Sequence, residues 1–247
     1  MPEKYDKKCV IVTGSSRGIG AATVKEFAKK GYNVVINYVN NQQQAEKLKY
    51  EIEHSFNVIA LTIKADISNE KEVEKLLELT IDEFGHIDCL VNNAGIAIDT
   101  TLEDKTVANF HKILDTNLLG PFLTCKHIGN YMFKQGHGSI VNISSTNGID
   151  SFYPYSMDYD ASKAGLISLN HNFALTFAPK VNVNCIAPGW VNTQMNKELD
   201  DDYKQKECEH ILLGRFAEPE EIAKFIVTVS ETAYLNDSII KIDGGRC

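Results

Sequence analysis

Residues 9–20, CVIVTGSSRGIG, combine an apolar run with a glycine-rich turn. The β-branched run Cys9–Thr13 predicts a buried strand, and the stretch after Gly18 has the period of an amphipathic helix. Glycines between a strand and a helix permit a tight turn, let the backbone approach a pyrophosphate, and let the helix pack closely on the sheet. Their spacing here is G-x-x-x-G-x-G rather than G-x-G-x-x-G. The turn therefore predicts a dinucleotide site; the plainer alternative is a tight strand-to-helix connection.

The same alternation of strand and helix continues to the end of the chain. Further short, β-branched runs predict strands at 33–38, 58–63, 87–92, 139–144, 181–187 and 239–242. Longer stretches of helical period lie between the first of these runs, at 18–30, 41–54 and 70–84. Nearly apolar strands separated by helices predict a parallel sheet covered on both faces. We therefore expect one α/β domain over 1–247, a doubly wound (Rossmann) sheet of seven parallel strands with helices on both faces, and a ligand site outside the carboxyl ends of its strands.

Composition narrows the class of protein. Of 247 residues 43% are hydrophobic, and 25 Lys plus Arg against 33 Asp plus Glu give a formal charge of −8. An acidic protein repels phosphate backbones, and no apolar run approaches the ~18 residues that cross a bilayer. The N-terminal stretch lacks the apolar segment of a signal peptide, and the six cysteines show no C-x-x-C pair or zinc-like spacing. We expect a cytoplasmic, globular protein with no metal and neither nucleic acid nor membrane as partner.

The end of the second strand indicates which nicotinamide cofactor would bind. NAD-binding sheets usually carry an acidic residue there for the ribose 2′-hydroxyl, whereas this chain has Asn37, Tyr38 and no carboxylate. Arg17 lies in the glycine turn, where an arginine can bind a 2′-phosphate with two hydrogen bonds. The alternative for Arg17 is a solvated side chain at a helix start. The pattern favours NADP(H) over NAD(H).

Polar and small residues follow two further strands. Asp66 and Ile67 come after the third strand, and Asn93, Ala94 and Gly95 come after the fourth. Each group alone is also ordinary turn chemistry. Because both lie at carboxyl ends of strands, together with the glycine turn they predict a wall of the cofactor site.

Tyr159 and Lys163 form the single Y-x-x-x-K match in the chain. Residues four apart lie on one face of a helix, and an ammonium close to a phenol favours the phenolate and lowers its pKa. Hydroxyls at Ser144 and Ser145 end the fifth strand, and the turn 188–193 ends the sixth. The sequence thus predicts an acid–base site at this edge of the sheet.

Over nearly its whole length the chain resembles the short-chain dehydrogenase/reductase family. The shared motifs, in the family's order, are the glycine turn 13–20, N-N-A-G at 92–95, Asn117, a serine at 144–145, Y-x-x-x-K at 159–163 and P-G-x-x-x-T at 188–193. Within the family the chain is most similar to 3-oxoacyl-(acyl-carrier-protein) reductases and related ketone reductases.

This resemblance implies a role for each catalytic position. Tyr159 would donate a proton to a substrate carbonyl oxygen, and Lys163 would bind the nicotinamide ribose and lower the pKa of Tyr159. Ser145, which we prefer to Ser144, would bind the carbonyl oxygen. Asn117 would hold a water that connects Lys163 to solvent as a proton relay.

The resemblance also implies a set of cofactor contacts. Asp66 and Ile67 would contact adenine, residues 93–95 the ribose, and residues 188–193 the nicotinamide amide. The expected cofactor residues are Gly14, Ser16, Arg17, Gly18, Ile19, Gly20, Asn37, Tyr38, Asp66, Ile67, Asn93, Ala94, Gly95, Tyr159, Lys163, Pro188, Gly189, Val191 and Thr193.

The expected function is NADP(H)-dependent reduction of a carbonyl, in a ketone or a 3-oxoacyl group, to a secondary alcohol. A carrier protein is itself acidic and would be steered by a basic rim, for which Lys134 and Lys180 are among few candidates. The charge balance thus favours a small carbonyl compound. An NAD-dependent alcohol or polyol dehydrogenase is the alternative enzyme, and a non-catalytic dinucleotide-sensing protein is the alternative from another class.

Two segments are expected to shape the substrate side of the site. The stretch 146–158 is rich in aromatic residues and about one residue longer than is usual in the family, and the polar stretch of about 190–214 is expected to be a mobile lid. The resemblance further implies a homotetramer formed through the helices that carry Asn117 and Tyr159.

Overall fold

The computed structural model describes residues 7–196 and 199–245. Seven strands form one sheet in the order β3-β2-β1-β4-β5-β6-β7, and all neighbouring strands are parallel. The strands are β1 Cys9–Val12, β2 Asn33–Tyr38, β3 Ala60–Lys64, β4 Cys89–Asn92, β5 Gly138–Ile143, β6 Val181–Pro188 and β7 Ile239–Ile242. The predicted doubly wound sheet is confirmed, with strand ends within two residues of the predicted ones. The order of strands reverses between β1 and β4, which is where such sheets bind ligands.

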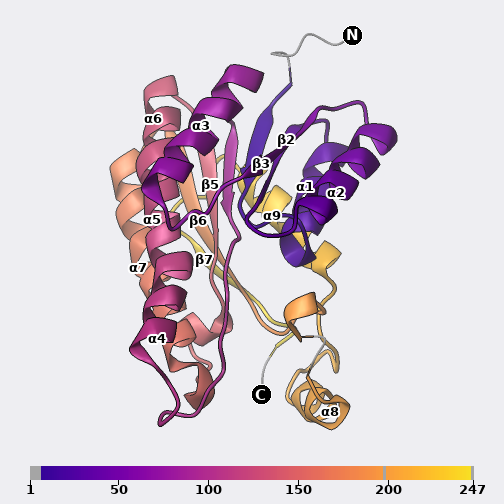
Figure 1. Cartoon of the computed structure of the whole chain (residues 1–247), viewed down its shortest axis with the longest axis vertical. Helices are drawn as coiled ribbons and strands as arrows, with labels where there is room; N and C mark the ends of the chain where they lie inside the picture. The colour runs from indigo at the N-terminus through magenta and orange to yellow at the C-terminus, as the bar shows by residue number, and fades with distance from the viewer. Residues whose placement is uncertain (1–6, 197–198, 246–247) are drawn as a thin grey trace.

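Helices cover both faces of the sheet (Figure 1). On one face lie α1 Gly18–Lys29, α2 Gln42–Ser55 and α9 Pro219–Glu231, and on the other lie α3 Glu70–Phe84, the helical stretch from Val107 to Gln135 and α7 Met157–Phe177. Side chains alternate along each strand, so Val10 and Val12 belong to the first core layer and Cys9 and Ile11 to the second. Burial on both faces explains why these strands are apolar throughout.

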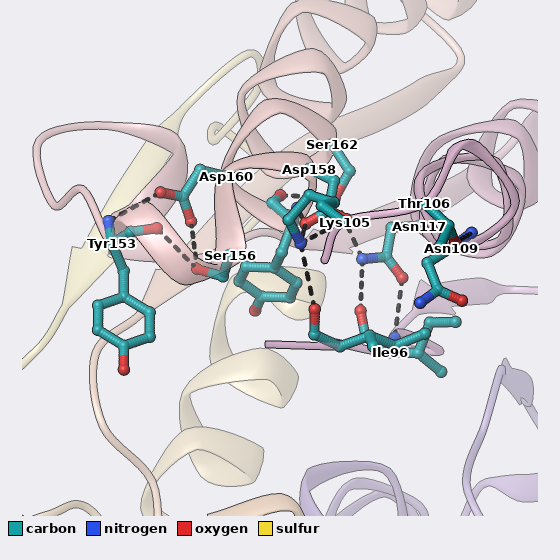
Figure 2. A network of polar contacts seen from close by, with 12 residues as sticks. Ile96, Lys105, Thr106, Asn109, Asn117, Tyr153, Ser156, Asp158, Asp160 and Ser162 are labelled. Atoms are coloured by element: carbon teal, nitrogen blue, oxygen red, sulfur yellow. Dashed lines mark hydrogen bonds and ion pairs between the residues drawn. The ribbon is translucent and has the colours of Figure 1, made fainter. Parts of the chain in front are cut away.

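The stretch from Val107 to Gln135 is an irregular helix. It consists of α4 Val107–Leu114, a wide π-helical turn η1 Asp115–Leu119, α5 Gly120–Thr124, a second π-helical turn η2 Cys125–Gly129 and α6 Asn130–Gln135. The Thr106 side chain starts it by accepting the N–H of Asn109 at 3.1 Å (Figure 2). π-Helical turns inside α-helices are frequent at functional sites, and the first of them carries Asn117, which is fully buried.

The stretch predicted as a lid contains two short helical segments, η5 Gln194–Asn196 and α8 Asp201–Glu209. Val191 forms a parallel bridge with Ala217, so the beginning of the stretch is fixed to the body of the protein. None of the α8 side chains is fully buried. Across the described residues, no helix combines the length and the apolar character required to span a membrane.

Candidate active site

The glycine turn is locked to the end of β4. The side-chain oxygen of Thr13 accepts the backbone N–H groups of Asn93 and Ala94, both at 3.0 Å. Gly14 has φ of 60°, and a Cβ on it would lie 2.9 Å from Ala94 Cα. A Cβ on Gly20 would lie 2.6 Å from Asn93 Nδ2. Side chains at either glycine would push β4 and the turn apart, so the close approach of the two segments explains the glycine spacing.

Asn37 supports the glycine turn through hydrogen bonds from its side-chain amide. Its Oδ1 accepts the N–H of Gly14 at 3.0 Å, and its Nδ2 donates to the Ala65 carbonyl at 2.9 Å. Asn37 is 1% exposed and Tyr38 is 7% exposed. These two residues were expected to contact the cofactor, but the Asn37 amide is already engaged with backbone on both sides. Asn37 therefore orders the turn, and β2 offers no carboxylate at its end.

The turn leads directly into the N-terminus of α1. Arg17 is exposed, and its guanidinium makes no hydrogen bond or ion pair that involves the described residues. A cavity of about 260 Å³ beside the start of α1 is lined by Gly18, by Thr193 of the turn after β6 and by Glu220 at the start of α9. A helix N-terminus with no acidic residue in its first turn, next to an exposed arginine, fits the negative charge of a dinucleotide. The remaining turn residues Ser16 and Ile19 are half-buried beside it.

The wall after β3 and β4 continues towards the catalytic residues. Asp66 Oδ1 accepts two hydrogen bonds from Ser68, at 2.9 and 2.7 Å, and Ile67 is buried, so it can offer a ligand little more than its backbone. A Cβ on Gly95 would lie 3.4 Å from Lys163 Nζ. The segment predicted to line the ribose therefore lies beside the Lys163 ammonium of α7.

Helix α7 carries the Y-x-x-x-K pair. The Lys163 ammonium lies 5.5 Å from the centre of the Tyr159 ring. It donates a hydrogen bond of 2.8 Å to the Ile143 carbonyl at the end of β5. Lys163 is only 4% exposed, and this burial lowers its pKa to about 8. The structure thus brings the predicted pair to the carboxyl edge of the sheet.

The two serines after β5 differ in what their hydroxyls contact. Ser144 donates to the Lys163 carbonyl at 2.9 Å and so ties β5 to α7. Ser145 accepts the N–H of Asn147 at 3.2 Å and donates to Asn147 Oδ1 at 3.3 Å, and its hydroxyl lies close enough to the Tyr159 phenol to lower the pKa of that phenol. Ser145 is the serine that the family resemblance favoured, and its role in binding a carbonyl oxygen stays a prediction.

The pKa of Tyr159 runs opposite to the expectation from sequence. Burial raises it to about 12, and the negative charges of Asp160 and Asp99 add to the increase. The expectation that Lys163 lowers this pKa is wrong for this structure, because the ammonium is bonded to the Ile143 carbonyl and desolvation of the phenol dominates. At neutral pH Tyr159 therefore carries its proton.

Asn117 holds the loop after β4 (Figure 2). Its Oδ1 accepts the Ile96 N–H and its Nδ2 donates to the Ile96 carbonyl, both at 2.9 Å. Nδ2 also donates to Ser162 Oγ at 3.1 Å. Both ends of the amide thus have protein partners, so a water at Asn117 would have to use its backbone carbonyl. The proton-relay role stays a prediction.

The turn after β6 is pinned at several points. The Gly189 N–H donates to the Ile242 carbonyl at 3.0 Å, and the Thr193 N–H donates to the Val191 carbonyl at 2.8 Å. Pro188 is the last residue of β6. The turn predicted to bind the nicotinamide amide is therefore rigidly placed opposite the glycine turn.

An aromatic cluster that sequence spacing does not predict begins in this turn and extends to α8. Trp190 stacks on Phe216, with ring centres 5.3 Å apart, and donates from Nε1 to Glu207 of α8 at 2.8 Å. Tyr203 of α8 packs edge-on against Trp190, with ring centres 6.1 Å apart, and its phenol lies beside Glu207 and Tyr153. The long segment before Tyr159, α8 and the turn after β6 thus meet at one place.

The sequence also did not predict two charged residues that lie close to Tyr159. Lys105 forms a buried ion pair with Asp158, which immediately precedes Tyr159. The pair joins positions 53 residues apart, and no spacing rule connects them. Only the acidic residues on both sides of Tyr159 could have drawn attention in the sequence.

A sequence profile described as short chain dehydrogenase matches residues 8–204. The chain belongs to this family. It is accordingly an oxidoreductase, and the resemblance seen in its motifs is confirmed. A 3-oxoacyl-[acyl-carrier-protein] reductase of Synechocystis is 37% identical over 95% of each chain.

Solved structures of other short-chain dehydrogenases superimpose closely on the chain. Levodione reductase has a TM-score of 0.91 at 30% identity, with 96% of each chain covered. ElxO, solved with NADP bound, has a TM-score of 0.87 at 30% identity, covering 97% of this chain and 98% of that protein.

Proposed function

We propose that this short-chain dehydrogenase is an NADP(H)-dependent reductase that converts the carbonyl of a small-molecule substrate into a secondary alcohol. The observation that carries the proposal is the meeting of Ser145, Tyr159 and Lys163 at the carboxyl edge of the sheet, beside a glycine turn that fits a dinucleotide. One domain would hold both the cofactor and the substrate.

In the proposed mechanism the bound nicotinamide supplies the hydride. The Ser145 hydroxyl donates a hydrogen bond to the substrate carbonyl oxygen and orients it. Tyr159, protonated at neutral pH because its pKa is about 12, gives its proton to that oxygen while the carbonyl carbon gains the hydride. Lys163, whose pKa of about 8 makes it able to exchange protons near neutrality, returns a proton to the phenolate.

Arg17 is proposed to select NADP(H). The absence of a carboxylate at Asn37 and Tyr38 and the exposed guanidinium of Arg17 support a 2′-phosphate there, and the relative ElxO was solved with NADP. We expect Arg17→Ala to lower kcat/KM for NADPH about 10- to 100-fold and to leave that for NADH nearly unchanged. An unaltered ratio between the two cofactors would refute the assignment.

The substrate is proposed to be a small carbonyl compound rather than a carrier-protein thioester. The chain carries a net charge of −8. Burial raises the pKa of Tyr153, and the negative charges of Asp99 and Glu207 near this tyrosine add to the increase. Such surroundings do not attract an acidic carrier protein. The resemblance to levodione reductase fits this choice, while the similarity to a carrier-protein reductase keeps 3-oxoacyl groups within the panel to be tested.

A panel of ketones, 3-oxoacyl thioesters and sugar alcohols, each with NADP(H) and NAD(H), tests the function. We expect NADPH-dependent reduction of small ketones, and a decrease in kcat of about 10²- to 10⁴-fold in Tyr159→Phe. The matched control is Tyr234→Phe, a fully exposed tyrosine after α9 and outside the site, which should keep its activity. Oxidation of sugar alcohols with NAD would establish the polyol dehydrogenase instead. Tight cofactor binding with no turnover would favour a dinucleotide sensor.

The assembly and location belong to the same proposal. We propose a cytoplasmic homo-oligomer, a tetramer by family resemblance, with neither nucleic acid nor membrane as partner. Free cysteines support a reducing compartment: Cys9, Cys89, Cys125, Cys185 and Cys208 are all unpaired. Apolar side chains exposed on α4, α5 and α7 support an interface there.

A further inference from the structure

The loop between β4 and α4, residues 93–106, is tied to Tyr159 by a first chain of hydrogen bonds (Figure 2). Asn117 holds the backbone of Ile96 and donates to Ser162 Oγ at 3.1 Å. Ser162 in turn donates to the Tyr159 carbonyl at 2.6 Å. The predicted family residue Asn117 thus connects this loop to the backbone of the catalytic tyrosine.

A second chain reaches Tyr159 from the other side, through a buried ion pair. Lys105 Nζ lies 2.9 Å from both carboxylate oxygens of Asp158 and 3.3 Å from the Ile98 carbonyl. The side chains of Lys105 and Asp158 are 5% and 0% exposed. Asp158 Oδ1 also accepts the N–H of Tyr159 at 3.0 Å. Lys105 therefore clamps the loop onto the residue that precedes the catalytic tyrosine.

The neighbouring acidic residue, Asp160, anchors the opposite flank. Its carboxylate accepts hydrogen bonds from the Tyr153 N–H at 3.0 Å, the Ser156 hydroxyl at 3.1 Å and Asn147 Nδ2 at 2.7 Å. Figure 2 shows the Asp158 and Asp160 carboxylates in separate networks. The backbone on each side of Tyr159 is therefore held by a carboxylate, and only the one at Asp158 is matched by a buried cation.

A gain in the stability of the fold is a weak explanation for the presence of a buried ion pair of this kind. Removing two charges from water is costly, and apolar residues of similar volume often stabilise a fold as well or better. What such a pair supplies is a fixed geometry. Here that geometry relates Tyr159 to the loop whose first residues, Asn93 to Gly95, border the glycine turn and Lys163.

We propose that Lys105 is a positioning residue for the reaction: its ion pair with Asp158 fixes the Tyr159 phenol relative to the cofactor wall. The inference rests on the proposed role of Tyr159 as proton donor. It adds a charged residue from the loop before α4 to Ser145, Tyr159 and Lys163, which follow β5 or lie on α7.

The charges around Tyr159 determine the sign of the expected pH effects. Lys163 and Asp160 face it from its own helix, and Asp99 and Lys105 lie on the loop. Lys105 and Asp158 offset each other in the intact pair. Removing the cation leaves a negative charge that raises the pKa of Tyr159, and removing the carboxylate leaves a positive charge that lowers it.

The test compares Lys105→Met, Asp158→Asn and the double variant with the native enzyme, using a ketone that the panel identifies. We expect kcat to fall about tenfold or more in all three, with the Kd for NADPH unchanged, because small misplacements of a catalytic group are costly. The alkaline limb of the pH profile of kcat should shift up in Lys105→Met and down in Asp158→Asn, and it should return in the double variant. Lys126→Met, which removes an exposed ion pair with Glu70, is the matched control.

The double variant keeps the test decisive even where a single variant does not fold, because it leaves no unpaired buried charge. If the folded double variant turns over at the native rate, Lys105 does not position Tyr159. Tyr159→Phe is measured in parallel: turnover that survives this change would contradict the proposed function itself rather than the role of Lys105. The pKa of the Tyr159 phenol can also be measured without substrate, by ultraviolet titration of the Asp158→Asn variant. The same variant with Tyr159→Phe added is the blank, and the difference between the two titrations should show the lowered pKa of Tyr159.

Discussion

At the scale of single residues, the hydroxyls of Ser144 and Ser145 have different expected roles: Ser144 stabilises the fold, and Ser145 takes part in the reaction. Ser144 donates to the Lys163 carbonyl at 2.9 Å, whereas the Ser145 hydroxyl lies beside the Tyr159 phenol and lowers its pKa. We expect Ser145→Ala to lower kcat about 10²-fold with little loss of stability. Ser144→Ala should instead lower the free energy of unfolding by about 1 kcal/mol and affect kcat much less. Turnover and urea unfolding of both variants check this, and equal losses of kcat would contradict it.

Lys163 makes stability depend on pH. Its pKa falls from 10.5 to about 8 on folding because it is buried, so between these values the folded chain binds fewer protons than the unfolded chain. The free energy of unfolding should therefore rise as pH increases through this window, and the burial cost at neutral pH is about 3 kcal/mol.

Lys163→Met removes this titration. Urea unfolding at about pH 7 and about pH 9.5 should show the native protein gaining stability relative to the variant at the higher pH. A difference in stability that stays constant with pH would mean that Lys163 is not buried as an ammonium.

At the scale of elements, α8 is attached to the body mainly by polar and aromatic contacts. Ahead of it Val191 bridges to Ala217, and after it the Leu212 N–H donates to the Gly245 carbonyl at 2.7 Å. The stretch of about 190–214 was expected to be a lid, and these two fixed ends restrict the proposed moving part to the region of α8.

The residue that would hold α8 closed is Glu207, which accepts a hydrogen bond from Trp190 at 2.8 Å and lies beside the Tyr203 phenol. We expect Glu207→Ala to raise KM for the ketone about fivefold, leave the Kd for NADPH unchanged, and change the free energy of unfolding by about 0.5 kcal/mol or less. Hydrogen exchange in α8 should be faster in this variant. Glu209→Ala, exposed on the same helix, is the control; if both variants behave alike, Glu207 does not hold the lid.

At the scale of the whole molecule, apolar side chains remain exposed where α4, α5 and α7 lie together. Val107 and Leu175 are 73% and 79% exposed, and the half-exposed Phe122 ring lies 6.3 Å from Phe173. We expect light scattering to give the mass of a tetramer, and Phe122→Asp to reduce it. Tyr50→Asp, on the exposed surface of α2, should not. A monomer mass for the native protein would exclude the proposed assembly.

Much of the fold is visible in the sequence because local patterns report it directly. Each strand is apolar throughout because both faces of the sheet are covered. The start of α3 at Glu70 follows from the cap at Asn69 and its end at Phe84 from the left-handed Gly85, so its bounds agree with the prediction. The order of the glycine turn and the Y-x-x-x-K pair places both at one edge, since parallel strands share their carboxyl ends.

The sequence by itself thus determined the doubly wound sheet, the family and the segments that meet at the site. Tertiary structure alone decided that Asn37 supports the glycine turn, that the pKa of Tyr159 is raised rather than lowered, and that Lys105 pairs with Asp158. The physical reason is common to all three. Burial and long-range pairing depend on which distant segments the fold brings into contact. The spacing of residues along the chain does not predict these contacts.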